Sequence, residues 1–286
     1  MNKIFKVVWS KTKECYVVVS EVAKNNGGKK KVLASVLAGL AMVGAGAAGT
    51  PVQAGGYYGN SAVNIAPDNL AGSNYANAVS KNSVVVGYQN NSTGGPNNES
   101  GKIIYGANNT ANRESSLAVG NQNTASNKST SAIGVGNTAS GEASVALGNA
   151  NTASGDRSIA IGSGAEATKA GTVAVGRKAL ATDGQAVAIG EEAEASGPSS
   201  VAVGYKNQST KSVAVGFGVN NKVYGEKSTA VGSSNTIAAN ANEATVIGRT
   251  NQVNRAGSFV GGFSNVTNGE RNVAVGSENT TTGEDS

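Results

Sequence analysis

Three short glycine motifs are the first candidates for chemistry in this sequence: Gly134–Gly136 (GVG), Gly162–Gly164 (GSG) and Gly216–Gly218 (GFG). Glycine pairs of this kind bind phosphate groups when a strand precedes them and a helix follows. No helical pattern follows any of the three, so they predict turns of the chain and not nucleotide sites. A fourth stretch, Gly95–Lys102, has one residue too many for a Walker loop, and Ile103 stands where that loop needs a hydroxyl.

Acidic side chains offer no better catalytic or metal-binding candidates. Glu191, Glu192 and Glu194 form the densest acidic cluster, but catalytic carboxylates need a cleft that shifts their pKa values. A calcium-binding β-roll needs an aspartate at each turn, and only four aspartates follow residue 54. The sequence contains no histidine, and its single cysteine is Cys15. We therefore predict a protein that is not an enzyme and holds no metal and no cofactor, with the three glutamates on its solvated surface.

The net charge of +5 comes from the first 54 residues, which hold eight lysines and two glutamates. The remaining residues carry 15 basic and 16 acidic side chains, a net charge of −1. Lys29–Lys31 is followed by an uncharged run rich in Ala and Gly, residues 32–49, and then by a small-residue cleavage pattern. These features are typical of a secretory signal peptide, and they predict cleavage between Ala54 and Gly55. Removal of the basic leader leaves no charge-based argument for nucleic-acid binding.

A membrane anchor is the alternative interpretation of residues 32–49, because 18 uncharged residues are near the lower limit for a spanning helix. The run lacks a charged stop on its far side and ends at Thr50-Pro51, just before the cleavage pattern. These signs favour removal of the leader.

A glycine that ends a short apolar phrase recurs along the chain, and we call it the ruler glycine. Ser144–Gly148, Ser158–Gly162 and Thr172–Gly176 read SVALG, SIAIG and TVAVG. The interval between ruler glycines is 14 residues from Gly106 to Gly204, 19 before that window and 12 to 16 after it. A fixed period over many units predicts a stacked solenoid. The ruler glycines are Gly87, Gly106, Gly120, Gly134, Gly148, Gly162, Gly176, Gly190, Gly204, Gly216, Gly232, Gly248, Gly261 (or Gly262) and Gly276.

Fourteen residues also equal two heptads, but a coiled coil fails because every unit contains glycine and its large apolar residues are Val and Ile. Val145 and Leu147 are separated by one residue, which is the alternation of a strand. A second alternating stretch, such as Asn151-x-Ala153, follows each ruler glycine, and a second glycine such as Gly155 closes the unit. Each unit therefore predicts strand, turn, strand, turn. Stacked units give an all-β fold of two facing parallel sheets.

Successive residues of the first strand point to opposite faces of its sheet. We expect Val and Ile to point into the core, toward Ala or Asn of the second strand. The residue between them then points outward, and this column of small residues suits close approach of a neighbouring chain; an exposed position without a partner is the alternative. Because the core of one roll is thin, we expect an obligate oligomer. The column is Ala118, Ala132, Ala146, Ala160, Ala174, Ala188, Ala202, Ala214, Ala230 and Ala274.

The SVAxG phrase with AxAxG behind it resembles the head repeats of YadA-like trimeric autotransporter adhesins, over about residues 82–286. Residues 1–24 likewise resemble the extended signal peptide region of large autotransported bacterial surface proteins, through residues 2–10 and 17–21. The resemblance implies a left-handed roll, a homotrimer of parallel chains and display on the bacterial surface. Members of the family continue into a stalk and a C-terminal outer-membrane anchor, so we expect this chain to be the N-terminal part of a longer protein.

Three segments follow from these observations: an extended signal peptide over 1–54, an N-terminal cap over 55–81 and head repeats over 82–286, with a polar insertion at 88–102. In the family, repeated NSVAIG-type phrases are linked to the binding of collagen and other matrix proteins. The matching phrases lack the preceding Asn, which puts collagen itself in doubt. They imply a candidate ligand-binding surface at Ser144, Ala146, Ser158, Ala160, Ser200, Ala202, Ser212 and Ala214.

The expected function is therefore adhesion to host extracellular matrix proteins, collagen-like or other, or to host cell-surface proteins. The alternative is a structural spacer or self-association rod without a specific host ligand.

Overall fold

The computed structural model describes residues 5–10, 15–20, 53–54, 63–66, 83–92 and 100–286. The chain divides into two compact units, Met1–Pro51 and Val52–Ser286. In the first unit, β1 (Phe5–Ser10) pairs antiparallel with β2 (Cys15–Ser20). The predicted apolar run 32–49 and Gly55 lie outside the described residues.

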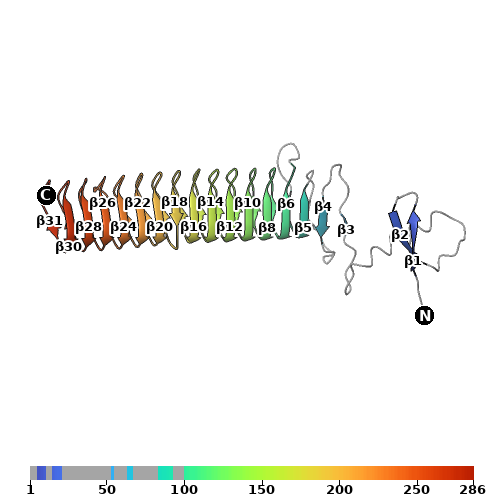
Figure 1. The fold of residues 1–286 in the computed structure, drawn as a ribbon. Helices are drawn as coiled ribbons and strands as arrows, with labels where there is room; N and C mark the ends of the chain where they lie inside the picture. The colour runs from blue at the N-terminus through green and yellow to red at the C-terminus, as the bar shows by residue number, and fades with distance from the viewer. Residues whose placement is uncertain (1–4, 11–14, 21–52, 55–62, 67–82, 93–99) are drawn as a thin grey trace. The chain divides into compact units, whose positions relative to one another are not determined.

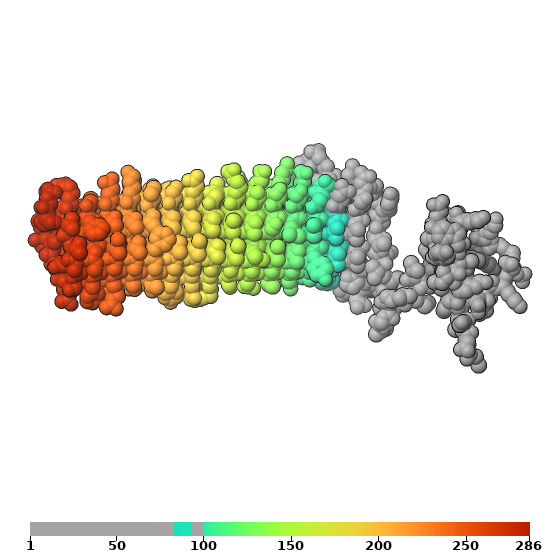
Figure 2. Space-filling model, viewed as in Figure 1, coloured from blue at the N-terminus to red at the C-terminus, as the bar shows by residue number. Residues whose placement is uncertain are grey.

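In the second unit the chain winds through repeated coils, each made of a long strand and a short strand joined by tight turns (Figure 1). Sixteen strands form the long-strand sheet and thirteen two-residue strands form the short-strand sheet. From β4 onward the strands pair in parallel with the next coil, and the coils appear as successive bands in chain order (Figure 2). The described residues contain no helix, so the predicted all-β parallel solenoid is confirmed.

The long-strand sheet contains β3 (Gln53–Ala54), β4 (Val63–Ala66), β5 (Val84–Tyr88), β6 (Ile103–Ala107), β8 (Leu117–Asn121), β10 (Ser131–Val135), β12 (Val145–Asn149), β14 (Ile159–Ser163), β16 (Val173–Arg177), β18 (Val187–Ile189), β20 (Val201–Tyr205), β22 (Val215–Val219), β24 (Thr229–Ser233), β26 (Thr245–Arg249), β28 (Phe259–Phe263) and β30 (Val273–Ser277). The short-strand sheet contains β7 (Thr110–Ala111), β9 (Thr124–Ala125), β11 (Thr138–Ala139), β13 (Thr152–Ala153), β15 (Glu166–Ala167), β17 (Leu180–Ala181), β19 (Glu194–Ala195), β21 (Gln208–Ser209), β23 (Lys222–Val223), β25 (Thr236–Ile237), β27 (Gln252–Val253), β29 (Val266–Thr267) and β31 (Thr280–Thr281).

Strand pairing corrects one ruler position and decides another that the sequence left open. Gly218, not Gly216, pairs with Gly204, so the interval there stays at 14 residues. The sequence Ser212–Gly218 contains two overlapping phrases, and the stacking register selects the second, which leaves Val213 in a turn with φ of 55°. Of the two later alternatives, Gly262 is the one that pairs with Gly248.

The ruler glycine is required because consecutive coils meet there at backbone distance. Gly148 has φ of 125°, a conformation that side chains with a Cβ rarely adopt. A Cβ on Gly148 would lie 2.0 Å from the carbonyl oxygen of Gly162 in the next coil. No other residue type fits that approach, which explains why glycine recurs at this place.

The interior of the roll is lined by small residues, and this reverses the predicted orientation of the long strand. Ala146 and the facing Ala153 are fully buried, whereas Leu147 is 39% exposed. Only Ala150 and Asn151 separate β12 from β13, so the two strands face each other across a thin interior that alanine fills in this coil. The expectation that the alanine column faces outward is therefore wrong.

The interior positions of the long strands are Val85, Ile104, Ala118, Ala132, Ala146, Ala160, Ala174, Ala188, Ala202, Gly216, Ala230, Val246, Val260 and Ala274. Ala214, which the sequence places in this column, is buried next to a turn instead, and Gly216 takes its place in the register. A Cβ on Gly216 would lie 3.1 Å from Ser209 Oγ and 3.5 Å from Val223 Cγ2. The glycine thus gives space to larger residues of the facing short strands.

Buried asparagines form a hydrogen-bonded ladder along the turn between the long and short strands. The side-chain amide of Asn137 donates to the side-chain carbonyl of Asn123 at 2.9 Å and to the backbone carbonyl of Gly148 at 2.8 Å. Its own Oδ1 accepts from the side-chain amide of Asn151 at 2.9 Å. The ladder satisfies backbone carbonyls that the turn leaves without a strand partner. Its members are Asn90, Asn109, Asn123, Asn137, Asn151, Asn207, Asn221, Asn235, Asn251, Asn265 and Asn279.

The ladder stops for three coils, where Ala165, Ala179 and Ala193 occupy the asparagine position. Asn151 Oδ1 there accepts the backbone N–H of Ala165 at 2.8 Å. The predicted inward direction of Asn and Ala at this position is confirmed.

The start of the predicted insertion at 88–102 belongs to the roll. Tyr88 ends β5, Asn90 joins the ladder, and Asn91 bridges to Thr110. Residues 93–99 lie outside the described part of the chain.

Candidate interaction surfaces

The outer face of the long-strand sheet carries two columns of mostly apolar side chains, which we call the apolar band. In β12 these are Val145 and Leu147, on either side of the buried Ala146. Exposure reaches 60% at Tyr105 and 66% at Val275. The first column is Val84, Ile103, Leu117, Ser131, Val145, Ile159, Val173, Val187, Val201, Val215, Thr229, Thr245, Phe259 and Val273. The second column is Val86, Tyr105, Val119, Ile133, Leu147, Ile161, Val175, Ile189, Val203, Phe217, Val231, Ile247, Gly261 and Val275.

The apolar band is too large for an ordinary solvated face. It crosses fourteen paired long strands, β5 to β30, and strands stacked about 4.8 Å apart give it a length of roughly 60 Å. Contiguous apolar patches above a few hundred Å² mark interaction sites in soluble proteins. The band is therefore the strongest candidate surface for association.

Charged and aromatic side chains border the band at the last position of the long strands. Arg177 forms ion pairs with Glu191 and Glu192, and Lys206 pairs with Glu192 at 3.4 Å. The hydrogen bond and charge of Glu191 raise the pKa of Arg177. A hydrogen bond to Tyr205 and the nearby Glu192 raise the pKa of Lys206. Glu191 and Glu192 thus form ion pairs with side chains of the preceding and following coils, and Glu194 lies on β19.

The outer face of the short-strand sheet is mostly polar, with Leu180 and Val266 as its apolar members. Thr124, Thr138 and Thr152 stack in consecutive coils, each half-buried. Further along, the Tyr224 hydroxyl donates to Gln208 Oε1 at 2.8 Å, and Gln208 Nε2 donates to Glu194 Oε2 at 3.0 Å. Burial, and secondarily the charge of Glu194, raise the pKa of Tyr224. This face offers hydroxyl, amide and carboxylate groups in a regular array.

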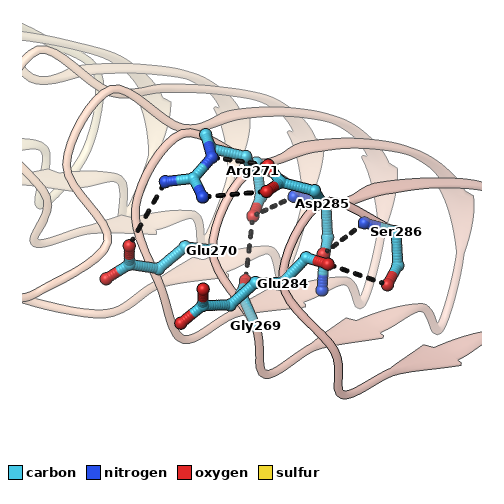
Figure 3. Close-up of polar contacts among 8 residues, drawn as sticks. Gly269, Glu270, Arg271, Glu284, Asp285 and Ser286 are labelled. Atoms are coloured by element: carbon cyan, nitrogen blue, oxygen red, sulfur yellow. Dashed lines mark hydrogen bonds and ion pairs between the residues drawn. The ribbon is translucent and has the colours of Figure 1, made fainter.

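The last described coil is held by an exposed ion pair between turns (Figure 3). Arg271 donates to Asp285 through Nε at 2.5 Å and through Nη2 at 3.0 Å, and its Nη1 lies 3.6 Å from Glu270. The hydrogen bond and charge of Arg271 lower the pKa of Asp285. Ser286 closes the coil by accepting the N–H of Val273 on its backbone carbonyl.

The predicted ligand-binding residues are mostly inside the roll. Seven of the eight are buried, namely Ser144, Ala146, Ser158, Ala160, Ser200, Ala202 and Ala214, and Ser212 is half-buried in a turn. In the folded chain these seven side chains are buried beneath the surface and are not available for ligand contact. Of the two residues at the predicted signal-peptide cleavage position, Ala54 ends β3 and Gly55 lies outside the described residues.

The glycine motifs and the Walker-like stretch of the sequence have structural roles. Gly134 and Gly162 are ruler glycines, and Gly136 and Gly164 are turn residues with positive φ. Lys102, the last residue of the Walker-like stretch, is buried, and its Nζ donates to the backbone carbonyl of Ser92 at 3.0 Å. Within the described residues no cluster of His, Cys, Asp or Glu could hold a metal ion. None of the residues that the structure describes belongs to a helix that could cross a membrane.

Sequence reasoning missed the apolar band itself, although its signal was present. The alternation of Val145, Ala146 and Leu147 shows one small and one large face. Alternation alone does not say which of the two faces lies inside, so the outer apolar face was not recognised.

Family models match both the leader and the repeats of the roll. Residues 1–50 match the extended signal peptide of the type V secretion system. The YadA head domain repeat matches in overlapping windows over residues 125–207 and again over 210–235. No curated protein matches the chain closely. The leader and the roll together show that the chain belongs to the YadA-like trimeric autotransporter adhesins.

Proposed function

We propose that the roll is the head of a homotrimeric adhesin, in which three parallel copies associate through their apolar bands. The observation that carries this proposal is the uncovered apolar band on the long-strand sheet. The interior of one roll is mostly alanine, so a single chain removes few large side chains from water. Association of three bands buries the larger residues, and the family to which the chain belongs is trimeric.

The trimer leaves the short-strand sheet and the turns exposed, and we place the ligand-binding surface there. The phrases at Ser144–Gly148 and Ser158–Gly162 hold this surface in position, while Thr138 and Thr152 present side chains to solvent. Because the same groups recur in each coil, binding is spread over several coils. The proposed ligands are extracellular matrix proteins, collagen-like or other, or proteins of the host cell surface. Because the family to which the chain belongs consists of adhesins, we propose a binding function without enzymatic activity.

The extended signal peptide supports export of the chain, and membership of the family supports its display on the bacterial surface. We propose that the head is held at the outer membrane by a C-terminal anchor of the family type. Protease treatment of intact cells that produce the complete reading frame should release the head, and a head that stays protected would contradict surface display.

Deletion of whole coils tests the adhesin proposal. Removal of residues 149–190 takes out three 14-residue units and joins Gly148 to Glu191, which preserves the register. Saturable binding of immobilised collagen, other matrix proteins or host cells by residues 55–286 should weaken with the deletion while the trimer persists. The uniformity of the coils also favours a second candidate, a spacer or self-association rod. Clumping of the protein without saturable binding to any of these ligands would support that candidate.

A further inference from the structure

We propose that Tyr105, Phe217, Phe259 and Gly261 set the axial register in which the three copies associate. This inference rests on the proposed trimer. It names the residues of the apolar band that favour an arrangement in which each coil lies beside the same coil of the neighbouring copy. A copy shifted along the stacking direction is then disfavoured.

Most of the band cannot distinguish an aligned copy from a shifted one. From Val119 to Val203 the second column contains only Val, Ile and Leu in seven consecutive coils. A shift by one coil, about 4.8 Å, places each of these side chains against another of nearly the same size. The same translational uniformity makes strand registers slip where one residue pattern repeats.

Three places in the band carry an aromatic ring or lack a side chain. Tyr105 stands between Val86 and Val119 in the second column, and its ring is 60% exposed. Phe217 stands between Val203 and Val231 and is 42% exposed.

The third place pairs a ring with a missing side chain in one strand. Phe259 occupies the first column of β28 and Gly261 the second. A Cβ built on Gly261 would lie 3.7 Å from Phe259 Cε1, so the ring covers the place that Gly261 leaves open. The neighbouring strands β26 and β30 carry Ile247 and Val275 at that place.

The spacing of the three places excludes every shifted alignment. Tyr105 and Phe217 are eight coils apart, and Phe217 and Gly261 are three coils apart. Because the two intervals differ, only the aligned trimer brings each of the three places beside the same place of the neighbouring copies. A shifted copy sets a ring of one copy against Val or Ile of its neighbour, and such overpacking is unfavourable. Aligned rings can also pair with one another.

Disulfide coupling can measure the register, because Cys15 is the only cysteine of the chain. The full chain with Cys15→Ser is prepared in two tagged forms that are refolded together. The aligned pair carries Leu147→Cys in both forms, and the offset pair carries Leu147→Cys in one and Ile161→Cys in the other. If the aligned pair does not couple, the first-column pair at Val145 and Ile159 replaces it. Coupling requires Cα atoms within about 7 Å.

In the parent background we expect aligned pairs to couple and offset pairs to remain reduced. The levelled variant, Tyr105→Val with Phe217→Val, Phe259→Val and Gly261→Val, leaves only Val, Ile and Leu in the second column and removes the aromatic ring from the first. In it the offset coupling should rise about tenfold, as expected for loss of one or two aromatic pairings. The Cβ contacts at Gly261 are of ordinary length, so valine fits there. Phe217→Val alone should give a smaller rise, which retains the test if the levelled variant assembles poorly.

The matched control changes four positions within the uniform segment, Val119→Ile, Ile133→Val, Val175→Ile and Val203→Ile, and should leave offset coupling at the parent level. Sedimentation equilibrium tests the trimer separately from the register. A monomeric parent overturns the trimer and the register together. A trimeric parent with equal aligned and offset coupling, or variants that stay aligned, overturns the register assignment alone.

Discussion

The side-chain amide of Asn137 donates a 2.9 Å hydrogen bond to the side-chain carbonyl of Asn123, one coil earlier in the roll. Both residues are fully buried, and each also bonds to the backbone of the turn. A polar network of this kind is stabilising only when it is complete.

Replacement of Asn137 by alanine should therefore be costly. The change leaves the Gly148 carbonyl, the Ile133 carbonyl and the Asn123 side chain without the amide that they share. We expect a loss of about 2–3 kcal/mol in the free energy of unfolding. The matched control is Asn149→Ala, an exposed asparagine of the next coil, which should change stability by less than about 0.5 kcal/mol. Denaturant titration measures both, and equal effects would show that the ladder adds no stability.

The ruler glycines give a second prediction. Gly148→Ala places a Cβ 2.0 Å from the Gly162 carbonyl oxygen, and it should destabilise the roll by at least about 3 kcal/mol. Gly136→Ala should cost only about 1 kcal/mol, because nothing lies within 4 Å of its Cβ and only the positive φ is strained. Thermal unfolding followed by circular dichroism compares the two, and a mild Gly148→Ala variant would mean that coils can separate at this position.

Substitution of two adjacent residues of β16 tests the core and the association surface separately. Ala174→Arg puts a charge into the closed interior and should prevent the surrounding coils from folding. Val175→Arg puts the charge on the apolar band and should shift the protein toward monomers that retain their β-sheet circular dichroism. Thr152→Arg, on the outer face of the short-strand sheet, should remain trimeric. A Val175→Arg variant that sediments as a stable trimer would remove the band from the interface.

Protonation of Asp285 should loosen the last described coil. Its pKa is lowered from the ordinary value of 3.8 by the hydrogen bond and charge of Arg271. A lowered pKa means that the ion pair stabilises the fold above the ordinary value and is lost as pH falls through the lowered one, so the change lies below about pH 4. A carboxyl titration by NMR should return toward 3.8 in Arg271→Gln and stay low in the control Arg255→Gln. An unchanged midpoint in Arg271→Gln would exclude this ion pair as the cause.

Removal of the leader remains a prediction from the sequence. The exported protein should begin at Gly55, because small residues precede it and the uncharged run 32–49 ends just before them. Such cleavage separates β3 from the antiparallel pairing with β4. N-terminal sequencing of protein shed from the cell surface checks this, and recovery of Lys29–Lys31 in the product would contradict it.

The spacing of glycine and β-branched residues was sufficient to predict the strands, the turns and the parallel stacking. It could not tell which face lies inside, because alternation fixes the two faces only relative to each other. Val145 and Leu147 were placed in the core by size, a rule that holds for thick cores. Here the inward position of the long strand is mostly small, as at Ala146, although Ile104 and Val246 occupy it in other coils, and the larger residues Val145 and Leu147 lie on the outer face.

The position of Gly218 also escaped the sequence, because the phrase at Ser212–Gly216 overlaps the true one. Only the pairing of β22 with β20 distinguishes them. The error carried Ser212 and Ala214 into the candidate surface. The other candidates, such as Ser144 and Ala146, were taken from phrases that match the family pattern, and they lie inside the roll.

The asparagine ladder and the interstrand hydrogen bonds run in the same direction, from each coil to the next. Tension applied along the stacking direction therefore acts on these bonds lengthwise, one coil interface after another, as in the opening of a zipper. The weakest interface yields first, and each coil that opens releases 14 residues, or about 48 Å of extended chain. A head built in this way lengthens stepwise under load and absorbs work at every step, while the coils that remain stacked keep their surfaces intact.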